Sequence, residues 1–458
     1  MIEIDLDLIK KYDKPGPRYT SYPTAPHFRD GFDPADYKSE LERTNAPDKE
    51  SEYSLYFHIP YCDTLCYFCG CNMIITHNRG RIGEYLEYLK KEMDLFSPMI
   101  NPGRRAAQLH WGGGTPTYLE PDEIAALTEC INKHFTFTAD AEISCEVDPR
   151  GLTFEHLKAL RQSGFNRISM GVQDFNYEVQ KAVNRIQDES LIRRIVGWVR
   201  ELEFHSINID LIYGLPFQTP QTFTDTINKI IDISPDRIAV FNYAHVPWMK
   251  KHMSLINEND LPRPDEKLQI LGNTITSFTS AGYEFIGMDH FAKPDDELTI
   301  ALREKRLYRN FQGYSIKAGT DLYAFGITGI SQTERMYVQN YKTEKEYYDS
   351  INSGRLPVAK GYRLNDDDML RRHVIMRLMC DFELNPRMIS KLYNIDFNQY
   401  FAESIALLEP MKNDGLVEIT PERIKVTSAG RLLIRNIAMN FDSYLLKKED
   451  AGKYSRTV

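Results

Sequence analysis

Three cysteines in one short stretch are the residues best suited to do chemistry. Cys62, Cys66 and Cys69 stand in a C-x-x-x-C-x-x-C spacing within YFHIPYCDTLCYFCGCN, which spans residues 56–72. Three thiolates so close along the chain can converge on one iron–sulfur cluster. Because a 4Fe–4S cube has four irons, three cysteine ligands leave one iron free to bind a group that is not protein. We therefore predict a 4Fe–4S cluster with one open iron.

Zinc binding and disulfide bonding are the alternatives for this stretch. Structural zinc usually takes four protein ligands from two separated C-x-x-C pairs. The other cysteines, Cys130, Cys145 and Cys380, occur singly and without histidines at finger spacing. Disulfides need an oxidising compartment, and no signal peptide is recognisable before the loop. The pattern therefore favours the cluster over zinc and over a purely structural group of thiols.

The composition bounds the class of protein. The chain has 458 residues, of which 42% are hydrophobic and 26% charged, so two or three globular domains are expected. A formal net charge of −9 argues against general nucleic-acid binding. No apolar run reaches the roughly 18 residues of a membrane span, and the acidic start MIEIDLDLIKKYDK is not typical of a targeting peptide. We expect a cytoplasmic protein.

Residues 53–282 alternate between short apolar runs and longer amphipathic ones, which predicts strands alternating with helices. Such an order implies a parallel sheet with right-handed crossovers. The expected strands are 54–59, 108–112, 142–147, 167–172, 206–213 and 237–243. The expected helices are 81–96, 122–135, 154–164, 189–202, 222–233 and 265–282.

Six strand–helix units are fewer than the eight that close a complete barrel. We therefore predict an α/β fold with an open, curved six-stranded sheet, with a doubly wound sheet as the alternative. Both arrangements place ligands beyond the carboxyl ends of the strands. The residues that follow or end the predicted strands are the cysteine loop, the run GGGTP from Gly112, Glu146, Gln173, Asp210 and Ala244.

The flanking regions are expected to form separate units. Residues 1–50 are rich in proline, tyrosine and charge and lack a sustained helical period, which predicts an arm packed across another domain. Residues 51–360 form the catalytic barrel and its extension. Residues 361–458 read as helices followed by a small hairpin, typical of a winged-helix-like module. DNA binding is the alternative for that module, but the acidic balance favours a packing or lid role.

The cysteine loop resembles that of the radical S-adenosylmethionine (SAM) superfamily, in which an aromatic residue precedes the third cysteine. The longer string HIPYC…CYFCGCN, which includes Cys71, and PGPRYTSYPTAPHF near the N-terminus are similar to the family of oxygen-independent coproporphyrinogen III oxidases. The similarity runs over nearly the whole chain. It implies a partial (β/α)6 barrel in which the open iron binds SAM and an electron from the cluster releases a 5'-deoxyadenosyl radical.

The resemblance also implies a reaction. Two propionate side chains of coproporphyrinogen III would be oxidatively decarboxylated to vinyl groups, giving protoporphyrinogen IX in haem biosynthesis, with two SAM used per product. An electron donor for the cluster and a final electron acceptor would be the partners of a monomeric enzyme. The alternatives are a haem-binding chaperone of the same superfamily and a radical SAM enzyme that acts on haem.

Some site residues combine a chemical argument with the resemblance. The glycines let a ligand approach the backbone closely, and by resemblance Gly113, Gly114 and Thr115 receive the methionine amino group of SAM. Glu146 would carry an unpaired carboxylate at a strand end, and a cationic ligand would relieve its burial. Arg185 offers a planar fork for the SAM carboxylate. Without the family, surface positions or salt bridges are the alternatives for Glu146 and Arg185.

The resemblance assigns the remaining cofactor contacts. We expect Gln173 and Asp210 to bind ribose hydroxyls, and Phe68 and Ala244 to flank adenine. A second SAM site would involve Tyr56, Gly113, Glu146 and Ile330. Cys71 is not a cluster ligand by this resemblance, and His58 could hydrogen-bond near the cluster. Candidate propionate contacts, each with a solvated surface role as the alternative, are Arg18, Arg303, Lys305, Arg306 and Arg309.

Overall fold

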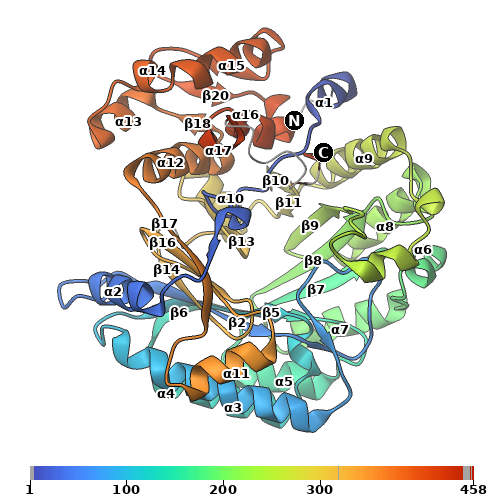
Figure 1. Cartoon of the computed structure of the whole chain (residues 1–458). Coiled ribbons are helices and arrows are strands. Elements are labelled where there is room, and N and C mark those ends of the chain that lie inside the picture. Colours follow the sequence, from blue (N-terminus) through green and yellow to red (C-terminus); the bar gives the residue numbers. More distant parts are fainter. Residues whose placement is uncertain (1–4, 318, 447–453, 455, 458) are drawn as a thin grey trace.

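A single large sheet organises the molecule (Figure 1). The computed structural model of the chain describes residues 5–317, 319–446, 454 and 456–457. All six predicted strands are present, and they lie side by side in chain order, each parallel to the next. They are β2 (Tyr53–Ile59), β5 (Ala106–Gly113), β6 (Phe137–Val147), β7 (Arg167–Gln173), β8 (Ser206–Tyr213) and β9 (Arg237–Asn242).

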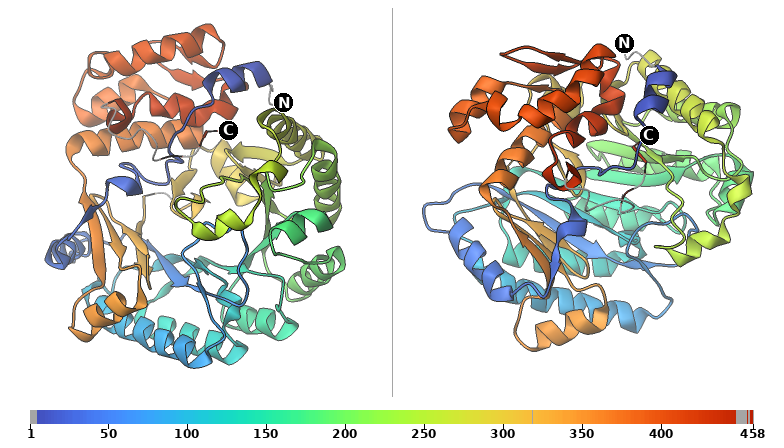
Figure 2. Two further views of the ribbon diagram at one scale, coloured as in Figure 1. Left: turned by 45° about the vertical axis from the view of Figure 1, so that its right-hand side comes forward. Right: turned by 45° about the horizontal axis from the view of Figure 1, so that its top comes forward.

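The unbroken order decides between the two predicted architectures. A doubly wound sheet reverses direction once, whereas here every crossover advances the same way, as in a barrel. The crossover helices consequently lie on the outer face of the curved sheet (Figures 1 and 2). They are α3 (Arg79–Phe96), α4 (Pro121–His134), α5 (Phe154–Gln162), α7 (Glu189–Glu201), α8 (Pro220–Ile233) and α9 (Pro264–Ser280).

The outer helices form because each carries an apolar stripe at helical spacing. In α7 the buried residues are Ile192, Ile195, Val196 and Val199, which recur three and four positions apart. They pack with the outward-facing residues of the strands in one continuous hydrophobic core. The predicted helices are thus confirmed, with ends that differ by one or two residues.

The sheet extends beyond the six predicted strands to thirteen. On one side β14 (Asp321–Phe325) pairs in parallel with β2 and is followed by four antiparallel strands, and on the other side two antiparallel strands follow β9. The sequence pattern missed them because most have only two to five residues, too few for an alternation to show. They are β15 (Ile330–Gln332), β16 (Met336–Asn340), β17 (Val358–Arg363), β1 (Arg29–Asp30), β11 (His290–Ala292) and β10 (Glu284–Gly287).

The N-terminal segment packs against the C-terminal helices, as expected of an arm. Tyr19 and Tyr22 are fully buried in a second hydrophobic core that consists mainly of C-terminal residues, and the Tyr19 hydroxyl donates to Asp442 at 2.9 Å. Figure 2 shows this segment running from those helices to the edge of the sheet. Two parts of this segment are helical, α1 (Leu6–Tyr12) and α2 (Pro34–Thr44), although no sustained helical period marks residues 1–50.

The C-terminal region is mainly helical with a small sheet. Its three strands lie in the order β18, β20, β19, so the predicted hairpin gains a third strand. Buried residues of the helices, including Val374 and Leu378, form the second core. The elements are α12 (Asp366–Asp381), β18 (Glu383–Leu384), α13 (Pro386–Tyr393), α14 (Phe397–Tyr400), α15 (Ala402–Asn413), β19 (Val417–Ile419), β20 (Ile424–Val426), η6 (Gly430–Leu433), α16 (Ile434–Met439) and α17 (Ser443–Leu446).

Short elements complete the described chain. They are η1 (Ala25–His27), β3 (Tyr61–Cys62), β4 (Ile74–Ile75), η2 (Ser97–Met99), η3 (Pro116–Tyr118), α6 (Tyr177–Ala182), η4 (Lys251–Leu255), η5 (Glu258–Asp260), α10 (Glu297–Arg303), β12 (Tyr308–Asn310), β13 (Gly313–Ser315) and α11 (Glu344–Asn352). Across the described residues, no helix combines the length and apolar content that crossing a bilayer needs.

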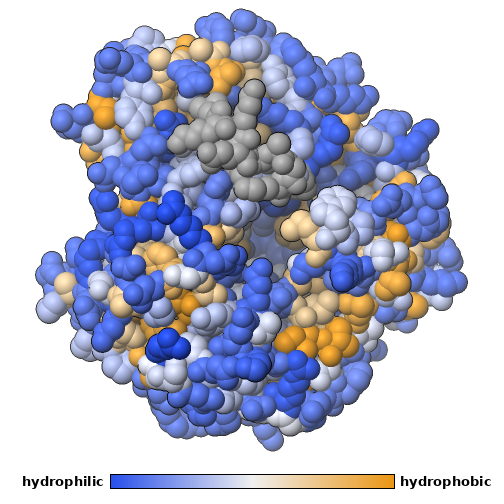
Figure 3. All heavy atoms as spheres, in the orientation of Figure 1, coloured by the Kyte–Doolittle hydropathy of each residue, from blue (hydrophilic) through white to orange (hydrophobic). Residues whose placement is uncertain are grey.

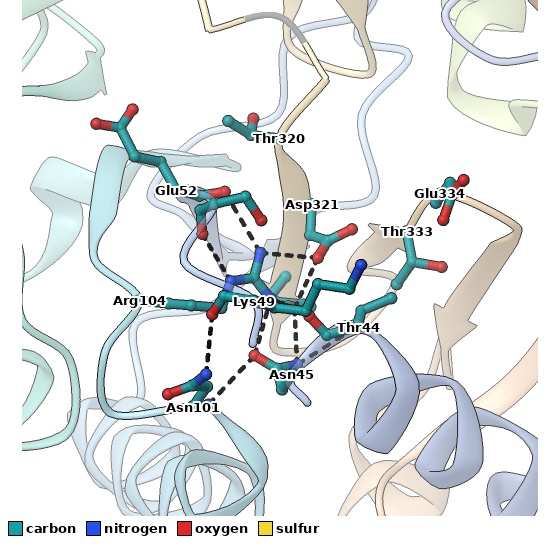
Figure 4. Close-up of polar contacts among 12 residues, drawn as sticks. Thr44, Asn45, Lys49, Glu52, Asn101, Arg104, Thr320, Asp321, Thr333 and Glu334 are labelled. Carbon is teal, nitrogen blue, oxygen red and sulfur yellow. Dashed lines mark hydrogen bonds and ion pairs between the residues drawn. The ribbon is translucent and has the colours of Figure 1, made fainter. Parts of the chain in front are cut away.

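A buried arginine joins these parts at the amino ends of the strands (Figure 4). Arg104, two residues before β5, donates to Asp321 Oδ2 of β14 at 2.8 Å, to Asn45 Oδ1 after α2 at 2.8 Å and to the Tyr323 hydroxyl at 2.9 Å. It also donates to the carbonyl oxygen of Ser51, just before β2, at 2.7 Å. One side chain therefore ties the N-terminal segment and the seventh parallel strand to the barrel.

Candidate functional site

The cysteine loop lies at the carboxyl end of β2, where the fold places ligands. Cys66 is buried, whereas Cys62 and Cys69 are partly exposed. All three border one cavity of about 290 Å³. The three predicted cluster ligands are thus brought to one place.

Side chains from distant segments hold the loop through its backbone carbonyls. Lys250 Nζ donates to the oxygen of Cys71 at 2.8 Å, and His252 Nε2 lies 2.8 Å from that of Cys69. His58 Nε2 lies 2.8 Å from the oxygen of Asn72. Because a carbonyl only accepts, this His58 nitrogen carries the proton, and Nδ1 accepts from the Tyr56 hydroxyl at 3.0 Å. His58 therefore positions the loop.

The thiols differ in their surroundings. Burial raises the pKa of Cys62 to about 12, while its sulfur shares a 3.3 Å hydrogen bond with the Thr115 hydroxyl. A hydrogen bond with Cys71 lowers the pKa of Cys69 to about 6, and the same bond raises that of Cys71. The pKa values of these two neighbouring thiols are therefore shifted in opposite directions.

Cationic side chains contact the thiols. The thiols border a shared cavity, and the Cys66 sulfur accepts hydrogen bonds from Arg150 Nη2 at 3.2 Å and Arg185 Nη1 at 3.4 Å. Cationic donors of this kind stabilise thiolate ligands. The residues present therefore fit a cluster with cysteine ligands.

The three glycines at the end of β5 are required by neighbours within the protein. A Cβ on Gly112 would lie 3.0 Å from the Glu146 carboxyl group, and one on Gly114 would lie 2.4 Å from the Pro60 oxygen. Gly113 has a φ of +119°, and a Cβ there would lie 2.7 Å from the His58 ring. Gly114 and Thr115 also border the thiol cavity. The run therefore fits the cysteine loop against β5 as well as leaving room for a ligand.

Glu146, at the end of β6, stands between two cavities. It borders the thiol cavity and a second cavity of about 600 Å³. Its carboxylate accepts from the Gly113 N–H at 3.2 Å and from His110 Nε2 at 3.3 Å. Desolvation raises the pKa of Glu146, but these hydrogen bonds outweigh it and leave the pKa below its ordinary value. The two cavities therefore meet at a permanent negative charge.

The second cavity gathers the residues predicted for a second SAM. Tyr56, Gly113, Glu146 and Ile330 all border it. Phe311, Gln312 and Lys342, which sequence reasoning did not single out, border it as well, together with Lys250 and Cys71. In the space-filling view of Figure 3 the molecule is hollowed near the centre of the face drawn, below the C-terminal helices.

Two buried polar atoms at the thiol cavity have no partner. Gln173 Oε1 and Arg185 Nε lie inside without a hydrogen bond, and both residues border the cavity. A ligand with hydroxyl donors and an acidic group would supply what these atoms lack. The rest of Arg185 is already engaged, because Nη1 donates to Asp148 Oδ2 and Nη2 to the Gly171 oxygen, at 2.8 and 2.7 Å. The Arg185 guanidinium, which was predicted to bind the SAM carboxylate, is therefore already paired in part with Asp148.

The remaining predicted residues lie at or near the same cavity. Phe68 and Asp210 border it, whereas Ala244 borders neither cavity. Burial, followed by the charge of Glu146, raises the pKa of Asp210 to about 6. Its carboxyl group accepts from Asn208 Nδ2 at 2.8 Å and from the Ser169 hydroxyl at 3.2 Å. Phe241, at the end of β9, was not predicted and borders the thiol cavity.

Sequence reasoning missed the residues that support the site. His110 orients Glu146, and its Nδ1 lies 2.6 Å from the Ser144 hydroxyl. Asp148 pairs with both Arg150 and Arg185, at 2.7 and 2.8 Å. A signal was present, because polar residues alternate along β5 and β6 on the face turned to the barrel interior. Those residues are Gln108, His110, Glu142, Ser144 and Glu146.

Comparisons with known proteins agree with this arrangement. Residues 56–230 match the model of the Radical SAM superfamily, and residues 364–433 match the HemN C-terminal domain. An oxygen-independent coproporphyrinogen III oxidase of Escherichia coli is 48% identical over 457 residues, covering 100% of this chain and 99% of that protein. The enzyme of the same name from Synechocystis is 46% identical over 461 residues, covering 100% and 98%.

A solved structure gives the same result. The coproporphyrinogen III oxidase of Escherichia coli, described as a radical SAM enzyme, superposes with a TM-score of 0.92 at 48% identity, covering 97% of this chain and 99% of that one. Fold, loop and full-length similarity point the same way. The chain belongs to the family of oxygen-independent coproporphyrinogen III oxidases.

Proposed function

We propose that this protein oxidatively decarboxylates two propionate side chains of coproporphyrinogen III to vinyl groups, giving protoporphyrinogen IX in haem biosynthesis. Each conversion removes one CO2 and one hydrogen atom from a propionate, and the electron left behind passes to an acceptor. The cofactors are a 4Fe–4S cluster and SAM, which when bound supply the 5'-deoxyadenosyl radical that takes the hydrogen atom. Two SAM are used per product.

The meeting of two cavities at Glu146 and Cys71 is the observation that carries the proposal. One cavity is bordered by the three thiols, and the larger one offers separate space beside it. We assign Cys62, Cys66 and Cys69 as cluster ligands. Cys71 is left out of that set by the family resemblance of the loop, and it borders both cavities. A radical enzyme needs a cofactor and a second molecule side by side with water excluded, and the two cavities supply those places.

The polar groups around the thiol cavity fit the parts of SAM. Glu146, held charged by His110 and Gly113, would take the ammonium group beside Gly114 and Thr115. Arg185 would contribute its unpartnered Nε to the carboxylate. Gln173 Oε1 and the Asp210 carboxyl group would accept from ribose hydroxyls. Phe68 and Ala244 are assigned to adenine, Phe68 with more support because it borders the cavity.

The second cavity is assigned to a second SAM, with Tyr56, Gly113, Glu146 and Ile330 as its contacts.

We divide the chain into an arm at residues 1–50, a barrel with its extension at 51–360 and a C-terminal domain at 361–458. The arm and the C-terminal domain share a core, which supports a packing role for the latter over DNA contact.

The proposal extends to cellular context. The enzyme would act as a monomer in the cytoplasm with a reduced electron donor and a final electron acceptor. All seven cysteines are free, as a reducing compartment allows.

Anaerobic reconstitution with iron, sulfide and SAM tests the function. Coproporphyrinogen should be consumed with release of CO2 and 5'-deoxyadenosine in equal amounts. Replacing Cys62, Cys66 or Cys69 by serine should remove cluster and activity together. Cys130→Ser is the matched control, because Cys130 lies on α4 and borders neither cavity. Tight haem binding without turnover would instead identify a chaperone, and turnover of haem alone would identify an enzyme acting on haem.

A further inference from the structure

Two of the candidate propionate contacts are brought together, and three are not. Arg303, Lys305 and Arg306 lie on the surface and pair with Glu284, Glu383 and Glu304. Arg18 and Arg309 instead meet inside the molecule, where Arg309 Nε donates to the Arg18 carbonyl oxygen at 3.3 Å. The three surface cations are therefore solvated, whereas Arg18 and Arg309 form an internal pair.

The internal pair is part of a concentration of positive charge. Arg309 and Arg435 are only 3% and 6% exposed. Arg435 donates to backbone oxygens, among them those of Pro17 at 3.0 Å and Thr457 at 3.0 Å. Burial, Arg435 and Arg309 lower the pKa of Arg18 to about 9. Among the described residues, the three arginines form one ion pair with a carboxylate, which joins Arg18 and Asp289. Over the ranges that the structure describes, the cluster therefore has more cations than ion-paired carboxylates.

Unused donors lie in the same region. Arg309 Nη1 is buried and has no hydrogen-bond partner. The Arg18 side chain is 35% exposed, so part of it is accessible to a ligand. A buried guanidinium N–H without an acceptor is costly, and a carboxylate is the acceptor that matches its geometry. Within the described part of the chain, Arg309 Nη1 therefore has no acceptor, and an anion would supply one.

The cluster adjoins the catalytic cavities. The Arg18 guanidinium carbon lies 5.8 Å from the centre of the Phe241 ring, and Phe241 borders the thiol cavity. His290, whose pKa is lowered to about 3 by burial and by Arg309, Arg18 and Arg237, borders a third cavity of about 120 Å³. That cavity shares Gln312 and His110 with the second one. An anion beside Arg18 would therefore lie next to the reacting groups.

We propose that Arg18 and Arg309 form a carboxylate site that holds a propionate of the porphyrinogen substrate. This assignment rests on the proposed function for the identity of the ligand. The propionate held there is one that the product retains, because a guanidinium ion pair stabilises a carboxylate and opposes its loss as CO2. Arg435 acts through Arg18 and Arg309 by adding positive charge behind them.

Binding of coproporphyrin III, the oxidised and unreactive form, tests the site in the reconstituted enzyme. Porphyrin fluorescence should show at least tenfold weaker binding for Arg18→Gln and Arg309→Gln, the loss expected for one charge-assisted hydrogen bond. Arg309→Lys keeps the charge and should recover part of that loss. The uncharged tetra-amide of coproporphyrin should bind all variants equally. Arg306→Gln is the surface control and should match the wild type.

Kinetics separate this proposal from the proposed function. KM for coproporphyrinogen should rise by a similar factor, with iron content at the wild-type level. Wild-type turnover together with unchanged porphyrin binding in Arg18→Gln would overturn the carboxylate site and leave the function standing. Weaker binding in Arg18→Gln with no wild-type turnover would support the site and overturn the function. If Arg309→Gln does not fold, the more exposed Arg18 carries the test.

Discussion

Replacing Glu146 by glutamine probes the junction of the two cavities. Its carboxylate has two hydrogen-bonded partners, Gly113 and His110, and faces the cavities with 45% of its side chain exposed. Glutamine preserves the shape and removes the charge. A hydrogen bond to a charged group contributes roughly 1.5–3 kcal/mol, so SAM should bind about 10- to 150-fold more weakly. Because the pKa of Glu146 lies below its ordinary value, the wild-type affinity should stay constant from about pH 5 to about pH 7, where the ammonium group of SAM keeps its proton.

Equilibrium binding of SAM to the anaerobically reconstituted variant is the assay, with iron and sulfide content measured on the same sample. The control is Glu129→Gln, which removes a carboxylate paired with Lys133 on the surface of α4. It should bind SAM as the wild type does. Wild-type affinity in Glu146→Gln at full cluster content would refute the role of the negative charge at the junction.

Three further predictions concern stability. Arg104→Met should lower the free energy of unfolding, measured by chemical denaturation, by about 3–5 kcal/mol, because Asp321 is left buried and unpaired. The double variant Arg104→Met/Asp321→Leu should recover much of that loss. Gly113→Ala should lower the melting temperature and cluster content because its Cβ meets His58, whereas Gly83→Ala, with nothing within 4 Å, should not. Asp210 binds its proton more tightly when folded, so its contribution to the stability of the apoprotein should be lost as pH rises from about 4 to about 6, and the difference in stability between the wild type and Asp210→Asn should change over that range.

The sequence was most informative where its patterns were long. Strands β2 and β5–β9 and their helices repeat an apolar period, and their boundaries were predicted to within two residues, except that β6 begins at Phe137 and not at residue 142. The parallel strand β14 was missed because its five residues are all buried, so no alternation marks it. Helix α2 was missed because many of its residues are charged. Its buried residues, such as Tyr37 and Leu41, recur three or four positions apart.

The sequence predicted which residues belong to the site better than it predicted the contacts between them. Cys62, Cys66 and Cys69 are recognisable from spacing alone. The pairing of Arg185 with Asp148 depends on the segment after α6 and the loop after β6 coming together, which no local pattern encodes. The same holds for Arg18 and Arg309, which are nearly 300 residues apart in sequence.

Electron paramagnetic resonance of the reduced, anaerobically reconstituted protein shows whether the three cysteines hold a cluster with one open iron. We predict the signal of a 4Fe–4S cluster that is held by Cys62, Cys66 and Cys69. Its shape should change when SAM is added, because the fourth iron is open to SAM. A mononuclear metal, or a cluster whose signal is indifferent to SAM, would contradict this prediction.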